Sequence, residues 1–369
     1  MNIVVIGVLP SSLVNFRGEL LKHLSSSYSV TAMGSGATEL EIREIEKCAT
    51  AYVDYKVART GLNPISDSKT LIELYRKFRK SKPEIVLAYT IKPIVWGGIA
   101  SRLVGVKQFY ALVTGLGYAF QPGGFVKSLL NITVKFLYRT ALKGAKAVIF
   151  QNVDNMKAFI EQGIVPESKC HVVNGSGVDL SHFKKEPLPQ TPCFLLIARL
   201  LGDKGIREYA KAAKIVKQHF PNAEFHLVGP EDSSPDAIKI EEVESWQQGG
   251  YVKYHGSSVD VRLHLQQASI FVLPSYHEGM PRTVLEAMAM GRPVLTTDVP
   301  GCRQTVVSGE NGWLVEKENV EQLVERMIWY IEHKDKWEIM GDKGYKIASD
   351  KFDVHTINSE LCRIMGLRV

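Results

Sequence analysis

Two glutamates, Glu278 and Glu286, lie eight positions apart around a short turn. An apolar run ends at Pro274, Gly279 permits a sharp turn, and Pro281 suits the first turn of a helix. The first amides of a helix have no partner within it, so they bind anions such as phosphates. Carboxylates accept hydrogen bonds from hydroxyls, and two of them could hold sugar rings on either side of a diphosphate. Alternatively, Glu278 caps the helix and Glu286 faces solvent.

The turn between the glutamates supplies the rest of this expected donor site, which comprises Gly279, Met280, Pro281, Thr283 and Val284. Two cations on another turn, Arg199 and Lys204, would stabilise negative charge on a leaving diphosphate. Turns at Gly229 and Ser257 follow two further apolar runs and are expected to line the same pocket. Solvated loop cations and ordinary turn residues are the alternatives for these four positions.

Three turns in the first half of the chain are expected to contact an acceptor. Their candidate residues are Ser11, Asn15, Arg17, Thr90, Lys92, Thr114 and Gly115. Arg17 and Lys92 either touch a phosphate or make structural ion pairs. The turns at Thr90 and Thr114 carry no carboxylate, so they offer no base for an acceptor hydroxyl.

Short apolar strands that alternate with helical patterns must position these residues. Such alternation is typical of parallel sheets, in which ligands bind beyond the carboxyl ends of the strands. The expected strands are Ile3–Val8, Glu84–Ala88, Gln108–Leu112, Ala147–Phe150 and His171–Val173, then Cys193–Ile197, Glu224–Val228, Val252–His255, Ile270–Pro274 and Pro293–Thr296. The expected helices include Val14–Ser25, Thr70–Lys80, Val95–Val104, Ile206–His219, Val259–Gln267 and Arg282–Met290.

The sequence therefore predicts two doubly wound, Rossmann-like α/β domains that face each other across a central cleft. The polar, proline-rich residues 184–192 are expected to form a linker. They would join an acceptor-binding domain, residues 1–183, to a nucleotide-sugar-binding domain, residues 193–350. Residues 351–369 are expected to form a helix that packs back across the domains.

The two halves of the chain differ in charge. The formal net charge is +6, of which residues 1–184 carry +10 and residues 185–369 carry −4. Residues 85–153 contain eight Lys or Arg and no Asp or Glu. Such a surface should attract nucleic acid, anionic lipid or a phosphate-bearing acceptor, unless it is only a basic solvated face. No recognition motif supports nucleic acid.

Residues Phe125–Arg139 combine apolar and basic side chains without an acid, the mixture of a helix that lies on a membrane surface. A core-facing helix with basic edges is the alternative. No apolar segment reaches the roughly 20 residues that span a bilayer, and the N-terminal residues do not resemble a signal peptide. Five scattered cysteines fit a reducing cytosol, and no metal-ligand motif is present in the sequence.

Several motifs together resemble the family-four glycosyltransferases over nearly the whole chain. In the second half they are the Arg199…Lys204 turn, Glu278-Gly279-Met280-Pro281 with Glu286-Ala287, Gly291-Arg292-Pro293-Val294 and Asn311-Gly312-Trp313-Leu314-Val315. Asn174–Asp179 resembles the family's NGVD turn with two residues inserted. In the first half, Asn15-Phe16-Arg17 and Thr114-Gly115-Leu116-Gly117 resemble bacterial N-acetylgalactosaminyltransferases that extend undecaprenyl-diphosphate-linked sugars. Tyr89–Lys92 stands where many relatives have a histidine-bearing loop.

This resemblance implies a GT-B fold, a UDP-sugar in the second domain, no metal or other cofactor, and retention of anomeric configuration. Glu278 would then contact the donor sugar and Glu286 the ribose. It also implies transfer of an N-acetylhexosamine or hexose to a lipid-diphosphate-linked saccharide in bacterial surface-polysaccharide assembly, such as O-antigen or capsule. The enzyme would lie on the cytoplasmic face of the inner membrane. A sugar-nucleotide epimerase or hydrolase, and a non-catalytic membrane-recruiting partner, are the alternatives.

Overall fold

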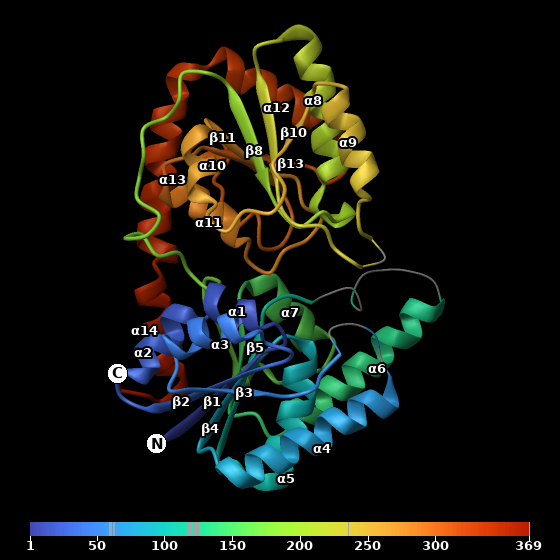
Figure 1. The fold of residues 1–369 in the computed structure, drawn as a ribbon, viewed down its shortest axis with the longest axis vertical. Coiled ribbons are helices and arrows are strands. Elements are labelled where there is room, and N and C mark those ends of the chain that lie inside the picture. Colours follow the sequence, from blue (N-terminus) through green and yellow to red (C-terminus); the bar gives the residue numbers. More distant parts are fainter. Residues whose placement is uncertain (59–60, 62, 117–119, 121–124, 235, 369) are drawn as a thin grey trace. The chain divides into compact units, whose positions relative to one another are not determined.

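In a computed structural model the chain divides into two units (Figure 1). Unit 1 comprises Met1–Ser176 and His355–Val369, and unit 2 comprises Gly177–Val354. The structure describes residues 1–58, 61, 63–116, 120, 125–234 and 236–368, with the backbone alone at 125–127. Each unit is built on one parallel sheet with helices packed against it, as the sequence predicts.

The sheet of unit 1 has seven parallel strands in the order β3-β2-β1-β4-β5-β6-β7. These strands are β1 (Asn2–Ile6), β2 (Ser29–Gly34), β3 (Ala51–Asp54), β4 (Ile85–Tyr89), β5 (Gln108–Val113), β6 (Ala147–Phe150) and β7 (Cys170–Val172). Strand order reverses between β1 and β4. The turns after these two strands therefore lie at a topological switch point, where such sheets bind ligands.

Side chains of unit 1 alternate between the two faces of its sheet and build a core on each face. Ile3 and Val5 belong to one core, and Val4 and Ile6 belong to the other. Leu361 of the last helix packs in the first of these cores. The helices are α1 (Pro10–Asn15), α2 (Gly18–Ser25), α3 (Glu39–Glu46), α4 (Pro64–Ser81), α5 (Gly98–Val104), α6 (Phe125–Leu142), α7 (Val153–Glu161) and α14 (Val354–Met365).

The sheet of unit 2 has six parallel strands in the order β10-β9-β8-β11-β12-β13. The strands are β8 (Cys193–Ile197), β9 (Glu224–Val228), β10 (Lys253–Tyr254), β11 (Ile270–Leu273), β12 (Val294–Thr297) and β13 (Gly312–Val315). Strand β8 reads CFLLI and is buried along its length, as a central strand of a covered parallel sheet must be. The switch point of this sheet lies between β8 and β11.

The helices of unit 2 are α8 (Ile206–His219), α9 (Ile240–Gln248), α10 (Arg262–Gln267), α11 (Arg282–Ala289), α12 (Val320–Glu332) and α13 (Trp337–Phe352). Residues Lys185–Gln190, here called the strap, run past α13. Arg292 is fully buried and holds the strap, since its guanidinium donates four hydrogen bonds to the carbonyls of Glu186, Pro187 and Ala268.

The unit boundaries differ from the predicted ones. Unit 2 begins at Gly177, before the expected linker, because Val178 and Phe183 are buried in its core. Residues 351 and 352 complete α13 rather than opening the last helix. The C-terminal helix α14 belongs to unit 1.

Some elements also differ from the sequence-based expectation. The helix expected over Val14–Ser25 is divided into α1 and α2, with Phe16 and Arg17 between them. Strands β2, β3 and β13 were not expected. Strands β3 and β13 are edge strands with partly exposed side chains, so their apolar signal is weak.

None of the helices in the described part of the chain combines the length and apolar character needed to cross a bilayer.

Candidate active site

The switch point of unit 2 brings together two of the predicted catalytic residues. Lys204 follows β8 and Glu278 follows β11, and Lys204 Nζ lies 2.8 Å from Glu278 Oε1. The two side chains are only 15% and 17% exposed. The backbone joins the same two turns, because Tyr276 N–H donates to Asp203 O at 2.8 Å. The turn after β8 and the turn after β11 thus form one site.

Two glycines allow the turns to approach so closely. Gly205 has a φ of +69°, and a Cβ there would lie 2.0 Å from the carbonyl oxygen of Pro274. Gly301, with a φ of +85°, would place a Cβ 2.6 Å from the carbonyl oxygen of Glu278. A side chain at either position would push the Glu278 turn away from its cationic partner.

The two cations of the site are held by carboxylates. Burial opposes the charge of Lys204, but Glu278 and Asp203 outweigh it and raise the pKa of Lys204 above its ordinary value. Arg199 Nη1 lies 2.5 Å from Oδ2 of Asp232, a residue on the loop after β9. Burial opposes the charge of Asp232, yet hydrogen bonds from Ser234 and Arg199 hold the pKa of Asp232 well below its ordinary value.

Helix α11 begins where the sequence places it. Pro281 is its N-cap residue, Met280 is buried just before it, and Thr283 and Val284 lie in its first turn. The first amides of a helix have no acceptor within it, so this end of α11 suits an anion. Gly279 and Glu278 immediately precede this end of the helix.

Glu286 lies inside α11 and is 5% exposed, so the alternative that it faces solvent is wrong. Burial raises the pKa of Glu286 to about 7, while the nearby Arg282 acts in the opposite direction. Arg282 Nε lies 2.7 Å from Glu286 Oε1. Both glutamates of the E-x7-E spacing therefore have a cationic partner, Lys204 for one and Arg282 for the other.

The remaining donor candidates lie on the turns after β9 and β10. Gly229 has a φ of +154°, and a Cβ there would lie 1.8 Å from Ala198 O, so the turn after β9 packs directly on the turn after β8. Gly229 N–H donates to Gly256 O at 2.8 Å, which joins it to the turn after β10. Ser257 is exposed on that turn.

In unit 1 the turns after β1 and β4 meet through three side chains. The Ser12 and Tyr89 hydroxyls lie 2.8 Å apart, and the Arg17 guanidinium lies 5.2 Å from the centre of the Tyr89 ring. Arg17 is 2% exposed because the break between α1 and α2 turns it inward. A Cβ at Gly7 would lie 2.2 Å from the Tyr89 hydroxyl, so glycine is required beneath this group.

Thr90 follows β4 at the switch point and has a φ of +66°, an unusual conformation for a β-branched residue. Its Oγ1 is buried and makes no hydrogen bond within the described part of the chain. A π-helical turn, Pro93–Gly97, comes soon after. Strained residues and π-turns concentrate at functional sites, so the loop fits a binding role.

Lys92 is engaged in a buried ion pair, with Nζ 2.8 Å from Asp67 Oδ1. Lys92 therefore makes a structural ion pair. Asp67 lies on α4, outside the acid-free stretch, so sequence reasoning did not associate it with the loop.

The remaining candidate acceptor residues lie on α1 and on the loop after β5. Ser11 and Asn15 are exposed on α1, and Thr114 and Gly115 follow β5. Gly117 and Tyr118, on the same loop, lie outside the described residues.

Sequence reasoning missed two residues of the unit 2 site, Asp232 and Arg282. Arg282 precedes Glu286 by four positions on one helix, a spacing that places side chains together and could have revealed it. Asp232 offers no such signal, because only the parallel pairing of β8 with β9 brings it to Arg199.

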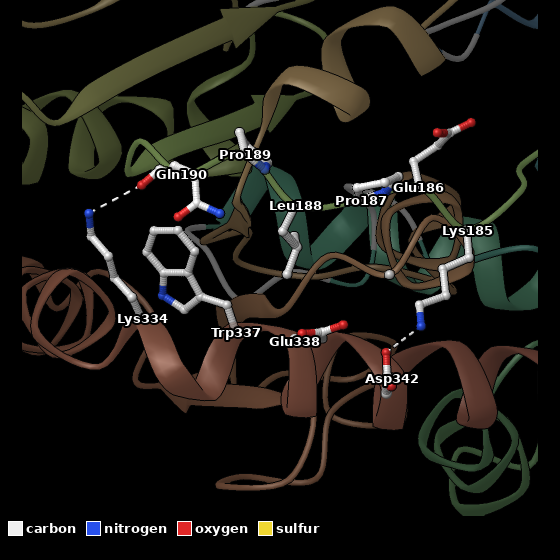
Figure 2. A pocket seen from close by; sticks show the side chains of 11 residues that line it. Lys185, Glu186, Pro187, Leu188, Pro189, Gln190, Lys334, Trp337, Glu338 and Asp342 are labelled. Atoms are coloured by element: carbon white, nitrogen blue, oxygen red, sulfur yellow. Dashed lines mark hydrogen bonds and ion pairs between the residues drawn. The ribbon is translucent and has the colours of Figure 1, made fainter.

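A pocket of about 470 Å³ lies elsewhere in unit 2, between the strap and α13 (Figure 2). Lys185 pairs with Asp342 at 2.5 Å, and Lys334 Nζ donates to Gln190 O at 3.1 Å. Trp337 and Leu188 supply apolar walls, and none of the predicted site residues lines it. The predicted donor-site residues lie at the switch point of unit 2 instead.

Comparisons with known proteins identify the family of this chain. A family model described as glycosyl transferases group 1 matches residues 178–347, and one described as glycosyl transferase 4-like matches residues 19–152. The N,N'-diacetylbacillosaminyl-diphospho-undecaprenol alpha-1,3-N-acetylgalactosaminyltransferase of Campylobacter jejuni is 30% identical over 292 residues, covering 75% of this chain and 76% of that protein. The UDP-Gal:alpha-D-GlcNAc-diphosphoundecaprenol alpha-1,3-galactosyltransferase of Escherichia coli is 27% identical and covers 73% of this chain and 71% of that protein.

Solved structures show the same fold. Anabaena HepE in complex with UDP and glucose matches with a TM-score of 0.80 and 18% identity, covering 99% of each chain. A glycosyltransferase from Rickettsia africae matches with a TM-score of 0.78 and 18% identity, covering 99% of this chain and 97% of that one.

Proposed function

Because this chain belongs to the group 1 glycosyltransferases, with the GT-B fold, we propose that it moves a sugar from a UDP-sugar to a lipid-diphosphate-linked saccharide in bacterial surface-polysaccharide or glycan assembly. The transferred sugar would be an N-acetylhexosamine or a hexose. The observation that carries the proposal is the pair of charge contacts at the unit 2 switch point, Lys204 with Glu278 and Arg282 with Glu286.

In this proposal the donor lies over the first turn of α11. The diphosphate would accept hydrogen bonds from the helix amides and from Arg199 and Lys204. Glu278 would accept hydrogen bonds from the donor sugar, and Glu286 from the ribose. Preorganised donors aimed at the leaving diphosphate stabilise the charge that develops as the glycosidic bond breaks.

We further propose that transfer retains the anomeric configuration and needs no metal. The bond between the sugar C1 and the leaving phosphate oxygen breaks, and a bond forms on the same face to the acceptor oxygen. The acceptor proton passes to the leaving phosphate oxygen, so no protein carboxylate is required as a base. Arg199 and Lys204 would do the work that a metal ion does in other transferases.

Unit 1 would bind the acceptor at its own switch point. Arg17 supplies a buried positive charge beside Tyr89, which suits a phosphate group. The unpartnered Thr90 hydroxyl would gain a hydrogen bond from a bound saccharide or phosphate. Ser11, Asn15, Thr114 and Gly115 would contribute at the rim. Lys92 would support the loop through Asp67 rather than touch the ligand.

Helix α6 gives a physical reason to expect a membrane surface. Leu129, Ile132 and Phe136 are 57%, 63% and 64% exposed, and their spacing places them along one side of the helix. Val134 and Tyr138 are buried on the core side, so α6 has two apolar faces. Because the helix contains basic residues and no acid, its outer face suits an anionic lipid surface.

We therefore propose peripheral attachment at the cytoplasmic face of the inner membrane, where a lipid-diphosphate acceptor would be met. Anionic lipid would attract the basic side chains, and the apolar side chains would enter the interface.

A donor and acceptor panel tests the function. Purified protein is mixed with UDP-sugars, with and without a lipid-diphosphate-linked sugar, and UDP release is measured. Release that depends on the acceptor, with a lengthened lipid-linked product, supports a transferase. Equal release without acceptor would indicate a hydrolase, conversion of the sugar without release would indicate an epimerase, and no reaction with any donor would favour a non-catalytic partner.

A further inference from the structure

A second group of reactive side chains lies at the other end of the unit 2 strands from the candidate donor site. Cys193 is the first residue of β8 and Glu224 is the first residue of β9, and the two are paired across the sheet. His226 lies two residues beyond Glu224, so it shares the same face. One ligand atom each of Cys193, Glu224 and His226 lies within 4.8 Å of the others.

The burial of this group resembles a metal site with one open side. Cys193 is 3% exposed and His226 is 6% exposed, whereas the Glu224 side chain is 53% exposed. A cation could therefore enter past the carboxylate and meet the thiol and the imidazole behind it. Ser269 fixes the inner ligand, because its hydroxyl accepts from Cys193 N–H at 2.8 Å and donates to Cys193 O at 3.1 Å.

Two further histidines lie near His226, outside the group of three ligands. The His255 ring lies 4.8 Å from the His226 ring, and its Nε2 is buried without a hydrogen-bond partner among the described residues. His264 lies 5.0 Å from His255 on its other side. His226 Nε2 lies 3.0 Å from Glu224 Oε2, so the imidazole and the carboxylate already face each other beside the Cys193 thiol.

We propose that Cys193, Glu224 and His226 bind a Zn²⁺ ion, with a water molecule as the fourth ligand. Thiolate, imidazole and carboxylate together are typical zinc ligands, while Mg²⁺ and Ca²⁺ prefer oxygen alone. Zinc bonds of about 2.0 to 2.3 Å in a tetrahedron place ligand atoms about 3.3 to 3.8 Å apart. Small side-chain rotations from the present separations would reach that geometry.

This ion would have a structural role that goes beyond the proposed transfer. It would join the starts of β8 and β9, whereas Arg199 and Gly229 follow the ends of these strands. His255 directly precedes Gly256, which accepts the hydrogen bond from Gly229. Metal binding would therefore stiffen the strands that position the donor turns without touching the diphosphate.

Metal titration of the full-length protein tests the site. Chelator-treated protein is titrated with Zn²⁺ by calorimetry and with Co²⁺ by absorbance, because a thiolate ligand gives Co²⁺ a charge-transfer band in the near ultraviolet. We expect one Zn²⁺ per chain, the band, and a higher melting temperature with Zn²⁺. Cys193→Ser should abolish the band, and Glu224→Gln should weaken Zn²⁺ binding at least tenfold.

Matched variants separate the site from other thiols and histidines. Cys170→Ser and His219→Asn change residues outside the cluster and should leave one Zn²⁺ per chain and the cobalt band intact. Wild-type binding without the band, or binding that survives both Cys193→Ser and Glu224→Gln, would overturn the proposal. Glu224 is exposed, so its substitution should not unfold the chain and remains decisive if Cys193→Ser does.

An assay of sugar transfer by the metal-free protein separates the zinc proposal from the proposed glycosyltransferase function. The titration does not depend on finding the right donor, so zinc binding can succeed or fail whichever UDP-sugar is used. If removal of metal abolished turnover and Zn²⁺ then restored it in Cys193→Ser as well as in the wild type, the metal would bind elsewhere. That result would contradict the proposed site.

Discussion

Asp232 holds Arg199 across two neighbouring strand-end turns, with Oδ2 2.5 Å from Nη1. The Asp232 side chain is only 2% exposed, and Ser234 also donates hydrogen bonds to it. Arg199 is 45% exposed, so its position depends on this buried partner. Asp232 is therefore a positioning residue for a proposed catalytic cation.

Replacement of Asp232 by Asn should lower kcat about tenfold, equivalent to about 1.4 kcal/mol, because Arg199 loses its charged partner. Steady-state kinetics would measure the change, with Asp342→Asn as a control because Asp342 on α13 pairs with Lys185 of the strap, away from the donor turns. In the double variant with Arg199→Ala, the Asp232 change should have no further effect on kcat. Additive losses would show that Asp232 acts by another route.

Lys204→Ala should reduce kcat by about 10²-fold or more, the usual loss when one preorganised donor to a developing anion is removed. The matched control is Lys211→Ala, an exposed lysine on α8 that should keep normal kinetics. Near-normal turnover in Lys204→Ala would contradict the assignment of this lysine to the leaving diphosphate. The melting temperature of each variant shows that the fold is intact.

Donor binding should weaken as the pH falls below about 7. The folded pKa of Glu286, about 7, lies above the ordinary value of 4.5, so the carboxyl is neutral below that pH and charged above it. Only the charged form pairs fully with Arg282 and accepts two hydroxyl hydrogen bonds. Calorimetry should give several-fold weaker UDP binding at pH 6 than at pH 8, after allowance for titration of UDP itself.

Glu286→Gln serves as the control for that titration. It should bind UDP weakly at both pH values, since an amide carries no charge to lose. If UDP binding by Glu286→Gln depended on pH as it does in the wild type, a group other than Glu286 would be responsible.

Gly205→Ala should destabilise unit 2 far more than Gly250→Ala. Both glycines have a left-handed φ, +69° and +73°, so both variants carry the backbone strain of about 1 to 2 kcal/mol. Only at Gly205 would the new Cβ also meet Pro274 O, at 2.0 Å. Chemical denaturation would compare them, and equal losses of the free energy of unfolding would contradict the close approach of the two turns.

Replacing Leu129, Ile132 and Phe136 by Ser should reduce binding to anionic vesicles at least tenfold. Each buried apolar side chain contributes about 1.5 to 3 kcal/mol, so the loss is large even if insertion is partial. Vesicle sedimentation measures it, and transfer to a water-soluble acceptor analogue should be unaffected. Leu40→Ser changes an equally exposed leucine on α3 and should leave vesicle binding unchanged.

The fold class and the position of the Glu278 turn before α11 could be predicted from the sequence because their signals are local. Apolar runs mark the central strands, and glycine and proline mark the turns that follow them. The position of α11 follows from Pro281 in the same way. Edge strands such as β3 and β13 are only partly buried, so their composition resembles that of a loop.

The contacts around the predicted residues could not be inferred, because they depend on tertiary pairing. Lys92 looks like a free loop cation until α4 brings Asp67 beside it. Arg17 looks like part of one long helix until the break between α1 and α2 buries it. A single sequence does not state the order of the strands in a sheet. That order brings Asp232 and Glu278 beside the turn after β8, which carries Arg199 and Lys204.

The division of the chain at Ser176 and His355 sets the order in which the two cores can be finished during synthesis. Unit 2 is one continuous segment, so its core is complete once Val354 has left the ribosome. Unit 1 must wait longer, because Leu361 and Met365 fill its core from the last helix. Unit 1, although its strands are made first, can therefore complete its core only after α14 has been synthesised.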